Sequence, residues 1–301
     1  MIGAIDVGGT KIAVGLVNLQ GQIIIRGETP SAGLMSYAAA LAYFAAELRR
    51  QSARTGAALD GVGIGLTGRV DRRSGLLTEN EFFPDWGGRD LAGDLGRELG
   101  LGVAMENDAD AAALAEARWG AGLGYRVFLY LTVSTGIGGG LVIDGRLYRG
   151  AQGWHPEIGH QVVSEQPTSC YCGASGCWEQ MACGPALSAW YQRQGGTSLT
   201  AAEICGLARR GDGPAREAVA HAGYWLGIGL ANLITLFAPE CIALGGGVMR
   251  SWDLFEPHVR AVIEKHCSFL VPHQMVTLLP ARLGSSAPLA GAACLWLHAN
   301  D

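Results

Sequence analysis

The sequence has 301 residues, of which 49% are hydrophobic and 16% charged, and its formal net charge is -5. A chain of this size and composition can bury a sizeable core, as one large domain or two of ordinary size. The mild negative charge provides no broad basic surface for nucleic acid. The short arginine pairs at 49–50, 72–73 and 209–210 are typical of solvated faces.

The start of the chain has no signal-peptide pattern. The residues MIGAIDVGGTK run directly into a strand-like segment, without a charged region, an apolar region and a cleavage site in succession. The most apolar stretch, Ala222–Pro239, includes glycines and an asparagine, which is typical of a buried helix and not of a membrane span. We therefore expect a cytoplasmic protein without a membrane partner.

Apolar runs interrupted by glycines open the chain. Ile2–Val17 contains two runs around a Gly-Gly pair, and after the turn Asn18–Gly21 the run Ile23–Ile25 predicts a third strand. Val127–Tyr148 repeats this arrangement about 125 residues later. The simplest explanation is an internal duplication, which predicts two similar halves with a cleft between them.

Helical and strand-like patterns alternate along the rest of the chain. Apolar spacing predicts helices over 35–50, 89–99, 109–119, 201–210, 213–237, 252–266 and 286–297, and a buried strand over 61–66. Either Asn107 or Asp108 would cap the helix that begins near 109. The segment that follows Gly150 is expected to be irregular. The predicted fold class is therefore α/β.

Three glycine-rich turns follow predicted strands. They comprise Asp6, Gly8, Gly9, Thr10 and Lys11 in the first, Thr135 and Gly136 in the second, and Gly245 and Gly246 in the third. Open backbone N–H groups in such turns suit phosphate, and the carboxylate of Asp6 suits a hydrated Mg²⁺. Any one of them also fits an ordinary tight turn, but the three together favour nucleotide binding. No Walker string occurs, and the G-x-G-x-x-G match at 63–68 lacks the apolar helix that a dinucleotide site requires.

Five segments carry a family resemblance, in the order DVGGTK, ENDADAAALAE, STGIGGG, EIGH with CYCGASGCWE, and LGGGV. Together they resemble the ROK family of bacterial sugar kinases and related repressors over nearly the whole chain. The resemblance implies an actin-like, ribonuclease-H-type fold whose two domains close over ATP and a sugar. We expect a small N-terminal α/β domain over 1–110, joined by the C-terminal helix near 286–301, and a larger α/β domain over 111–285.

A histidine and three cysteines form the pattern H-x9-C-x-C-x4-C, with His160, Cys170, Cys172 and Cys177. Three thiolates and one imidazole suit tetrahedral zinc and leave no position open for water, so the metal would be structural. From spacing alone, ordinary buried thiols remain the alternative. The family resemblance, in which these four positions ligate zinc, favours the metal. The other cysteines are scattered and typical of core thiols.

Asp108 is the predicted general base. Transfer of a phosphoryl group to an alcohol needs an acceptor for the hydroxyl proton, and Asp108 lies where a strand-like run ends and a helix begins. It also matches the catalytic aspartate of the family's N-D motif. The alternative is that it serves only as a helix cap. Asp110, close by, has no motif role.

The family's sugar-contacting positions fall on Asn107, Glu157, His160 and Glu179. His160 would bind zinc through one ring nitrogen and a sugar hydroxyl through the other. Gly68 and Arg69 resemble positions that lie near the acyl group in N-acetylmannosamine kinases, whereas His155 and Pro156 resemble the fructokinase branch. These two indications conflict, so the identity of the sugar stays open.

The sequence thus predicts transfer of a phosphoryl group from ATP, with Mg²⁺, to the 6-hydroxyl of a hexose or N-acetylhexosamine of the glucose, N-acetylmannosamine or N-acetylglucosamine type. The alternatives are a fructokinase of the same family, a sugar-sensing regulator without catalysis, and a repressor, although the strand at Ile2 leaves no room for a preceding helix-turn-helix. Polyphosphate is an alternative donor. The expected partners are the sugar, ATP and further copies of the chain in a homodimer or homotetramer.

Overall fold

The computed structural model describes residues 1–71, 73–78, 82–165, 168–267 and 276–300. By its internal contacts the chain divides into two compact units. The first unit comprises Met1–Gly124, Gly140–Pro156 and Arg282–Asp301, and the second comprises Tyr125–Gly139 and Glu157–Ala281.

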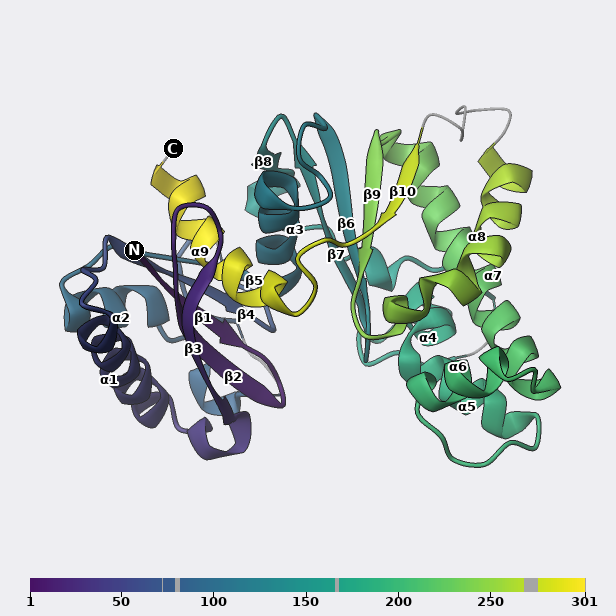
Figure 1. Cartoon of the computed structure of the whole chain (residues 1–301), viewed down its shortest axis with the longest axis horizontal. Helices are drawn as coiled ribbons and strands as arrows, with labels where there is room; N and C mark the ends of the chain where they lie inside the picture. The colour runs from purple at the N-terminus through teal and green to yellow at the C-terminus, as the bar shows by residue number, and fades with distance from the viewer. Residues whose placement is uncertain (72, 79–81, 166–167, 268–275, 301) are drawn as a thin grey trace. The chain divides into compact units, whose positions relative to one another are not determined.

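The first unit is built on a five-stranded sheet in the order β3-β2-β1-β4-β5 (Figure 1). Its strands are β1 (Ile2–Val7), β2 (Lys11–Val17), β3 (Ile23–Pro30), β4 (Gly61–Leu66) and β5 (Val103–Asn107). β2 is antiparallel to both β1 and β3, whereas β4 is parallel to β1 and β5. The glycine-linked hairpin, the third strand and the buried strand predicted from the apolar runs are confirmed.

Helices cover both faces of this sheet. The helices of the unit are α1 (Tyr37–Thr55), α2 (Leu91–Leu99), α3 (Asp108–Trp119) and α9 (Ala287–Asn300), with short 3-10 turns η1 (Ser31–Leu34), η2 (Pro84–Trp86), η3 (Ala151–Gly153) and η7 (Gly284–Ser286). Ile5 and Val7 of β1 share a core with α1 and α2, whereas Ile2 and Ala4 share a second core with α9. This alternation follows from the two-residue period of a strand. Asp6 therefore lies on the face that α9 covers.

A second sheet has the order β10-β9-β6-β7-β8. Its strands are β6 (Val127–Val133), β7 (Ile137–Ile143), β8 (Arg146–Leu147), β9 (Cys241–Gly245) and β10 (Thr277–Pro280). β9 is parallel to both β6 and β10, and β7 is antiparallel to β8. Read from β8 to β10, this order reproduces that of the first sheet from β3 to β5. The internal duplication predicted from the two glycine-linked segments is confirmed.

The helices of the second unit pack around one long helix. Its helices are α4 (Trp178–Ala182), α5 (Gly184–Arg193), α6 (Ala201–Arg209), α7 (Gly213–Phe237) and α8 (Trp252–Cys267), with η4 (Ile158–His160) and η5 (Val248–Ser251). Among the residues described, α7 is the one helix long and apolar enough to cross a membrane by length and composition. Because it packs against α4, α5, α6 and α8, it serves as the core helix of this unit. The sequence did not predict α4, α5 or β10.

Candidate active site and metal centre

The parallel strands β1, β4 and β5 bring three predicted segments of the site to one edge of the first sheet. Their register pairs Asp6 with Gly65, and Leu66 with Asn107. Each of the three strands ends within a residue or two of these pairs. The carboxyl ends of parallel strands are where open α/β sheets place their ligands. The first glycine turn, the turn after β4 and the start of α3 therefore lie next to one another.

The first glycine turn is held at both ends by Ser31. The Ser31 hydroxyl donates to the carbonyl of Gly8 at 2.6 Å, and its N–H donates to the carbonyl of Thr10 at 3.0 Å. A side chain at Gly9 would collide with Phe82, whose ring lies 2.7 Å from the position that a Cβ would take. Ser31 thus fixes the turn, and glycine at position 9 leaves room for the ring of Phe82.

Asp6 is a partly buried carboxyl group beside this turn. The pKa of Asp6 is raised to about 7, mainly by burial and also by the nearby carboxylate of Asp108, while the positive charges of Lys11 and Arg26 act in the opposite direction. The Lys11 ammonium group forms an ion pair with Glu28 at 3.0 Å. A divalent cation next to Asp6 would favour its ionised form, so this environment suits the predicted role in holding hydrated Mg²⁺.

The start of α3 settles which residue caps the helix. Asn107 is the N-cap, and its Oδ1 accepts from the N–H groups of Ala109 at 2.9 Å and Asp110 at 3.4 Å. Asp108 is the first helical residue; its Oδ2 accepts from the Thr67 hydroxyl at 2.9 Å and its Oδ1 from the N–H of Ala109. Burial raises the pKa of Asp108, and the hydrogen bond from Thr67 opposes that rise. Sequence reasoning missed Thr67, although its place directly after β4 was a usable signal.

The turn after β4 lies beside the same helix start. The amide of Asn107 donates to the carbonyl of Gly68 at 3.1 Å. The guanidinium carbon of Arg69 lies 5.9 Å from the ring centroid of Trp154, a geometry that favours a cation–π contact. Gly68 and Arg69, predicted near the sugar's substituent, are thus brought next to Asn107.

In the second unit, Glu179 supports the second glycine turn. Its buried carboxylate accepts a hydrogen bond from the N–H of Ile137 at 2.9 Å. A Cβ at Gly136 would lie 2.3 Å from the same carboxylate oxygen, so only glycine leaves room for it. Thr135 is exposed at the tip of the turn. Glu179, predicted from the family as a sugar contact, thus also orders the backbone of a predicted phosphate turn.

The third glycine turn lies beside the second. Gly245 ends β9, and Gly246 takes a left-handed conformation with φ of +89°. A Cβ at Gly246 would lie 2.3 Å from the carbonyl oxygen of Val133, the last residue of β6. A Cβ at Gly247 would lie 3.6 Å from the hydroxyl of Ser134 in the second turn. The second unit therefore brings two of the predicted nucleotide-binding turns together.

The four predicted metal ligands form one cluster. One donor atom from each of His160, Cys170, Cys172 and Cys177 lies within 4.8 Å of all the others. Nδ1 of the histidine is 3.5 Å from the Cys170 sulfur, and the sulfurs of the other two cysteines are 3.6 Å apart. A tetrahedron with Zn–S bonds of about 2.3 Å has edges of about 3.8 Å. The donor set and its spacing therefore fit Zn²⁺.

The second ring nitrogen of His160 faces a tyrosine. With Nδ1 turned toward the cysteines, Nε2 lies 2.9 Å from the hydroxyl of Tyr171, whose side chain is exposed. The backbone N–H of His160 donates to the backbone carbonyl of Glu157 at 3.0 Å. A Cβ at Gly159 would lie 1.9 Å from the carbonyl of Ile137, so this turn packs onto the beginning of β7. His160, Glu157 and the second glycine turn thus share one region; Tyr171 was not foreseen.

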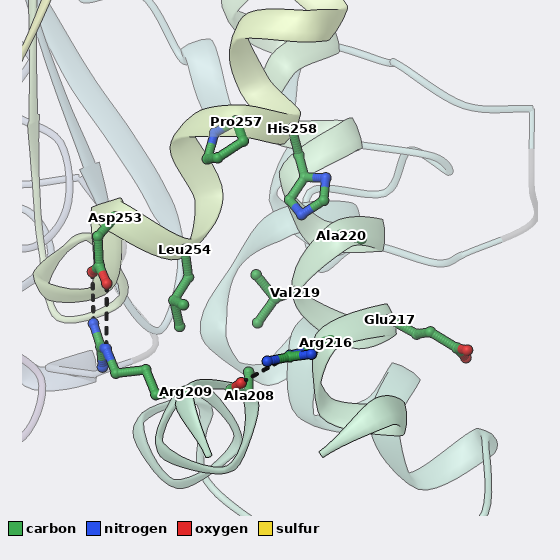
Figure 2. Close-up of a pocket in the computed structure, with 10 residues that line it drawn as sticks. All are labelled: Ala208, Arg209, Arg216, Glu217, Val219, Ala220, Asp253, Leu254, Pro257 and His258. Atoms are coloured by element: carbon green, nitrogen blue, oxygen red, sulfur yellow. Dashed lines mark hydrogen bonds and ion pairs between the residues drawn. The ribbon is translucent and has the colours of Figure 1, made fainter. Parts of the chain in front are cut away.

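A cavity of about 640 Å³ lies elsewhere in the second unit, between α6, α7 and α8 (Figure 2). Its lining residues are Ala208, Arg209, Arg216, Glu217, Val219, Ala220, Asp253, Leu254, Pro257 and His258. Arg209 forms an ion pair with Asp253 at 2.6 Å, and Arg216 donates to the carbonyl of Ala208 at 3.2 Å. None of the predicted site residues lines this cavity.

Comparison with known proteins identifies the family. The ROK family matches residues 2–299. The chain belongs to the ROK family. A glucokinase from Streptomyces coelicolor is 33% identical over 97% of this chain and 96% of its own length. The crystal structure of a ROK family glucokinase from Streptomyces griseus, in complex with glucose and AMPPNP, is 32% identical, covers 97% of each chain and superposes with a TM-score of 0.81.

The family also contains regulators. The xylose repressor of Bacillus subtilis is 31% identical over 77% of this chain but only 60% of its own length. The predicted family and the predicted α/β fold of the actin-like ATPase type, with its two mixed sheets, are confirmed by the family match and the solved structures.

Proposed function

We propose that this ROK protein is a kinase that transfers the γ-phosphoryl group of ATP, with Mg²⁺, to the 6-hydroxyl of a hexose or N-acetylhexosamine. One observation carries the proposal: Asp108 is held by Thr67 at the strand edge where Asp6 and the first glycine turn also lie. A proton acceptor, a carboxylate for the cation and a backbone turn for phosphate are the groups that such a transfer needs. The glucokinase relatives support the same activity.

Each group then has a role in the reaction. Asp108 accepts the proton of the attacking sugar hydroxyl, and its raised pKa makes it a better base than an exposed aspartate. Asp6 would hold Mg²⁺ through water, and the bound ion would supply neutralisation of charge on the phosphates. The nucleotide contacts come from the three glycine-rich turns, through Gly8 to Lys11, Thr135, Gly136, Gly245 and Gly246. The sugar contacts come from Gly68, Arg69, Asn107, Glu157, His160 and Glu179. His160 and the three cysteines would hold a structural zinc ion, which would tie together the loop that follows Glu157.

The first test is a coupled assay of ADP release with glucose, fructose, mannose, N-acetylglucosamine, N-acetylmannosamine and allose. At least one of these sugars should be phosphorylated. Asp108→Asn should lower kcat by about 10²- to 10⁴-fold, because the general base is lost, while sugar binding measured by calorimetry persists. Near-normal kcat in this variant would exclude Asp108 as the base.

A second aspartate-to-asparagine substitution, at a residue outside the predicted site, is the control for the loss of one negative charge. Asp253→Asn removes an exposed aspartate whose partner is Arg209 on the surface of the second unit. This variant should keep the wild-type kcat and KM. A fall in kcat equal to that of Asp108→Asn would show that loss of any aspartate disturbs the enzyme.

The relatives support one non-enzymatic alternative, a sugar-sensing regulator, because the xylose repressor of Bacillus subtilis is 31% identical over 77% of this chain. Sugar binding without phosphorylation of any tested sugar, with ATP or with polyphosphate as donor, would favour that alternative. We further propose that the enzyme is cytoplasmic and assembles as a homodimer or homotetramer, which light scattering of the purified protein would test.

A further inference from the structure

Four ionisable side chains form a buried cluster that the proposed chemistry does not use. Asp110 is fully buried and Glu106 is 5% exposed. The Arg149 guanidinium lies 2.8 Å from a carboxylate oxygen of Glu106 and 3.0 Å from one of Asp110. His155 Nδ1 lies 3.5 Å from the same oxygen of Asp110. One arginine thus joins two carboxylates that come from different elements, β5 and α3.

The two carboxylates bracket the predicted base. Glu106 precedes Asn107 directly, and Asp110 follows Asp108 by two residues. Arg149 therefore binds the chain on both sides of Asn107 and Asp108, the helix cap and the predicted base. A buried ion pair of this kind is weak evidence for stability, because desolvation offsets much of the attraction, but it fixes the groups that it joins.

The loop that carries Arg149 also contacts the start of α3 indirectly, through the turn after β4. Residues 149–155, which we call the 149–155 loop, also contain Trp154, and the guanidinium of Arg69 lies over its ring. Arg69 follows Gly68, whose carbonyl accepts from the amide of Asn107. The helix start is thus held by the 149–155 loop directly, through Arg149, and indirectly, through the turn after β4.

The Asp110 side chain also packs closely against β7. A Cβ at Gly140 would lie 2.8 Å from its Oδ1, so β7 leaves room for the carboxylate at that point. Any other residue at position 140 would press on Asp110 and on the helix start behind it. The contacts from the turn after β4, from β7 and from the 149–155 loop therefore converge on one short segment, residues 106–110.

We propose that Arg149 is a positioning residue for phosphoryl transfer, which holds residues 106–110 through Glu106 and Asp110 so that Asp108 meets the sugar hydroxyl in line with the phosphate. The inference rests on the proposed function, because it takes Asp108 as the base. Arg149 does not touch the reacting atoms. Its effect comes from geometry, since a displacement of about 1 Å at a reacting group can cost about 10²-fold in rate.

The test compares Arg149→Met, which keeps the length of the side chain and removes its charge, with Arg149→Lys. Arg149→Met should lower kcat by about 10²-fold and change the KM for the sugar by less than about threefold, because the base is displaced while most sugar contacts remain. Arg149→Lys should recover part of the lost kcat, since an ammonium group can pair with either carboxylate but not span both. The exposed arginine on β8 gives the matched control, Arg146→Met, which should behave as wild type.

A double variant separates positioning from folding. Arg149→Met leaves two buried carboxylates without their common cation, which can lower the thermal midpoint. Arg149→Met combined with Asp110→Asn removes one of those charges, so the midpoint should rise again while kcat stays low. Recovery of kcat together with the midpoint would show a purely structural role and overturn the proposal.

The remaining outcomes also decide the question. A kcat within about twofold of wild type in folded Arg149→Met would overturn the proposal while leaving the proposed function intact, provided that Asp108→Asn is inactive. If Asp108→Asn is fully active, the base assignment and the role of Arg149 fall together. Loss of kcat in Arg149→Met, partial rescue by lysine and an inactive Asp108→Asn would support both.

Discussion

The ionised form of the Asp6 carboxyl group is disfavoured in the folded protein. Asp6 lies on β1 beside Gly65 and faces the second carboxylate, Asp108, across the strand edge. In the unfolded chain it would have the ordinary pKa of 3.8, whereas burial in the folded protein raises the pKa to about 7. The folded protein therefore holds a proton at pH 5 that the unfolded chain tends to release. This group stabilises the fold below about pH 4, and the contribution is lost as the pH rises through about 7.

The side chain introduced by Asp6→Asn cannot ionise. The substitution should therefore remove the contribution of this group to the pH dependence of stability. In the absence of Mg²⁺, the free energy of unfolding of the variant, measured relative to wild type, should be higher at pH 8 than at pH 5 by about 2 kcal/mol. Urea unfolding at the two pH values measures this difference. An equal difference at both values would mean that Asp6 ionises normally in the folded protein.

At the scale of single residues, sequence reasoning named chemical groups but not their partners. Asn107 and Asp108 were both candidates for the helix cap, and only the hydrogen bonds of Asn107 decide between them. Asp110 has no motif role, yet it is fully buried against Arg149, a residue 39 positions later in the chain. A contact between such distant residues depends on where β7 and β8 place the 149–155 loop, which neither spacing nor composition encodes.

Among the elements, β4 shows why the G-x-G-x-x-G pattern at residues 63–68 occurs here without a dinucleotide site. Gly63 faces α9, where a Cβ would lie 1.7 Å from the carbonyl oxygen of Ala292. Gly65, two residues on, has open space by comparison, because its nearest neighbour would be the Cβ of Ala111 at 3.5 Å. The first glycine lets the helix approach the sheet, so the pattern there reflects packing.

This difference predicts unequal costs for two identical substitutions. Gly63→Ala should lower the free energy of unfolding by about 3 kcal/mol, because α9 must move away from the sheet. Gly65→Ala on the same strand is the matched control and should cost less than about 1 kcal/mol. Urea denaturation of both variants measures the two values. Equal costs would show that α9 can shift without penalty.

The zinc loop is the second element with a direct test. Purified protein should contain one zinc per chain by elemental analysis. Cys172→Ser should lower that content several-fold and reduce the thermal midpoint by about 5 °C or more, because binding of the metal contributes to folding. Cys205→Ser, at a buried cysteine of α6 outside the cluster, should keep its zinc. Wild-type protein without zinc, prepared without chelator, would refute the metal site.

The elements that sequence reasoning missed have weak local signals. β10 has only four residues and ends at Pro280, so no alternation can develop within it. α4 and α5 follow the cysteines almost without a break, and α5 opens with glycine and then proline, which also suits a turn. In contrast, α7 was predicted with its observed ends because 25 residues give its pattern room to repeat.

For the whole molecule, the duplication was the most informative feature of the sequence. Two glycine-linked pairs of apolar runs predicted similar halves, and the two sheets do share one strand order. The chain nevertheless returns to the first unit twice, with Gly140–Pro156 and Arg282–Asp301. Residues 140–156 could not be assigned to that unit from sequence, because their contacts with residues 69 and 106–110 join segments far apart in the chain.

The position of α9 bears on how the protein is made. Leu289, Ala292, Ala293 and Leu297 of this helix bury Ile2, Ala4, Ala13 and Val17 on one face of the first sheet. During synthesis on the ribosome, those strand residues emerge before the second unit, and the helix that covers them emerges after it. The nascent N-terminal sheet therefore waits with an uncovered apolar face while the whole second unit is translated. Domains usually complete their folding in the order of synthesis, but here the first sheet is covered only by a helix that is made after the second unit.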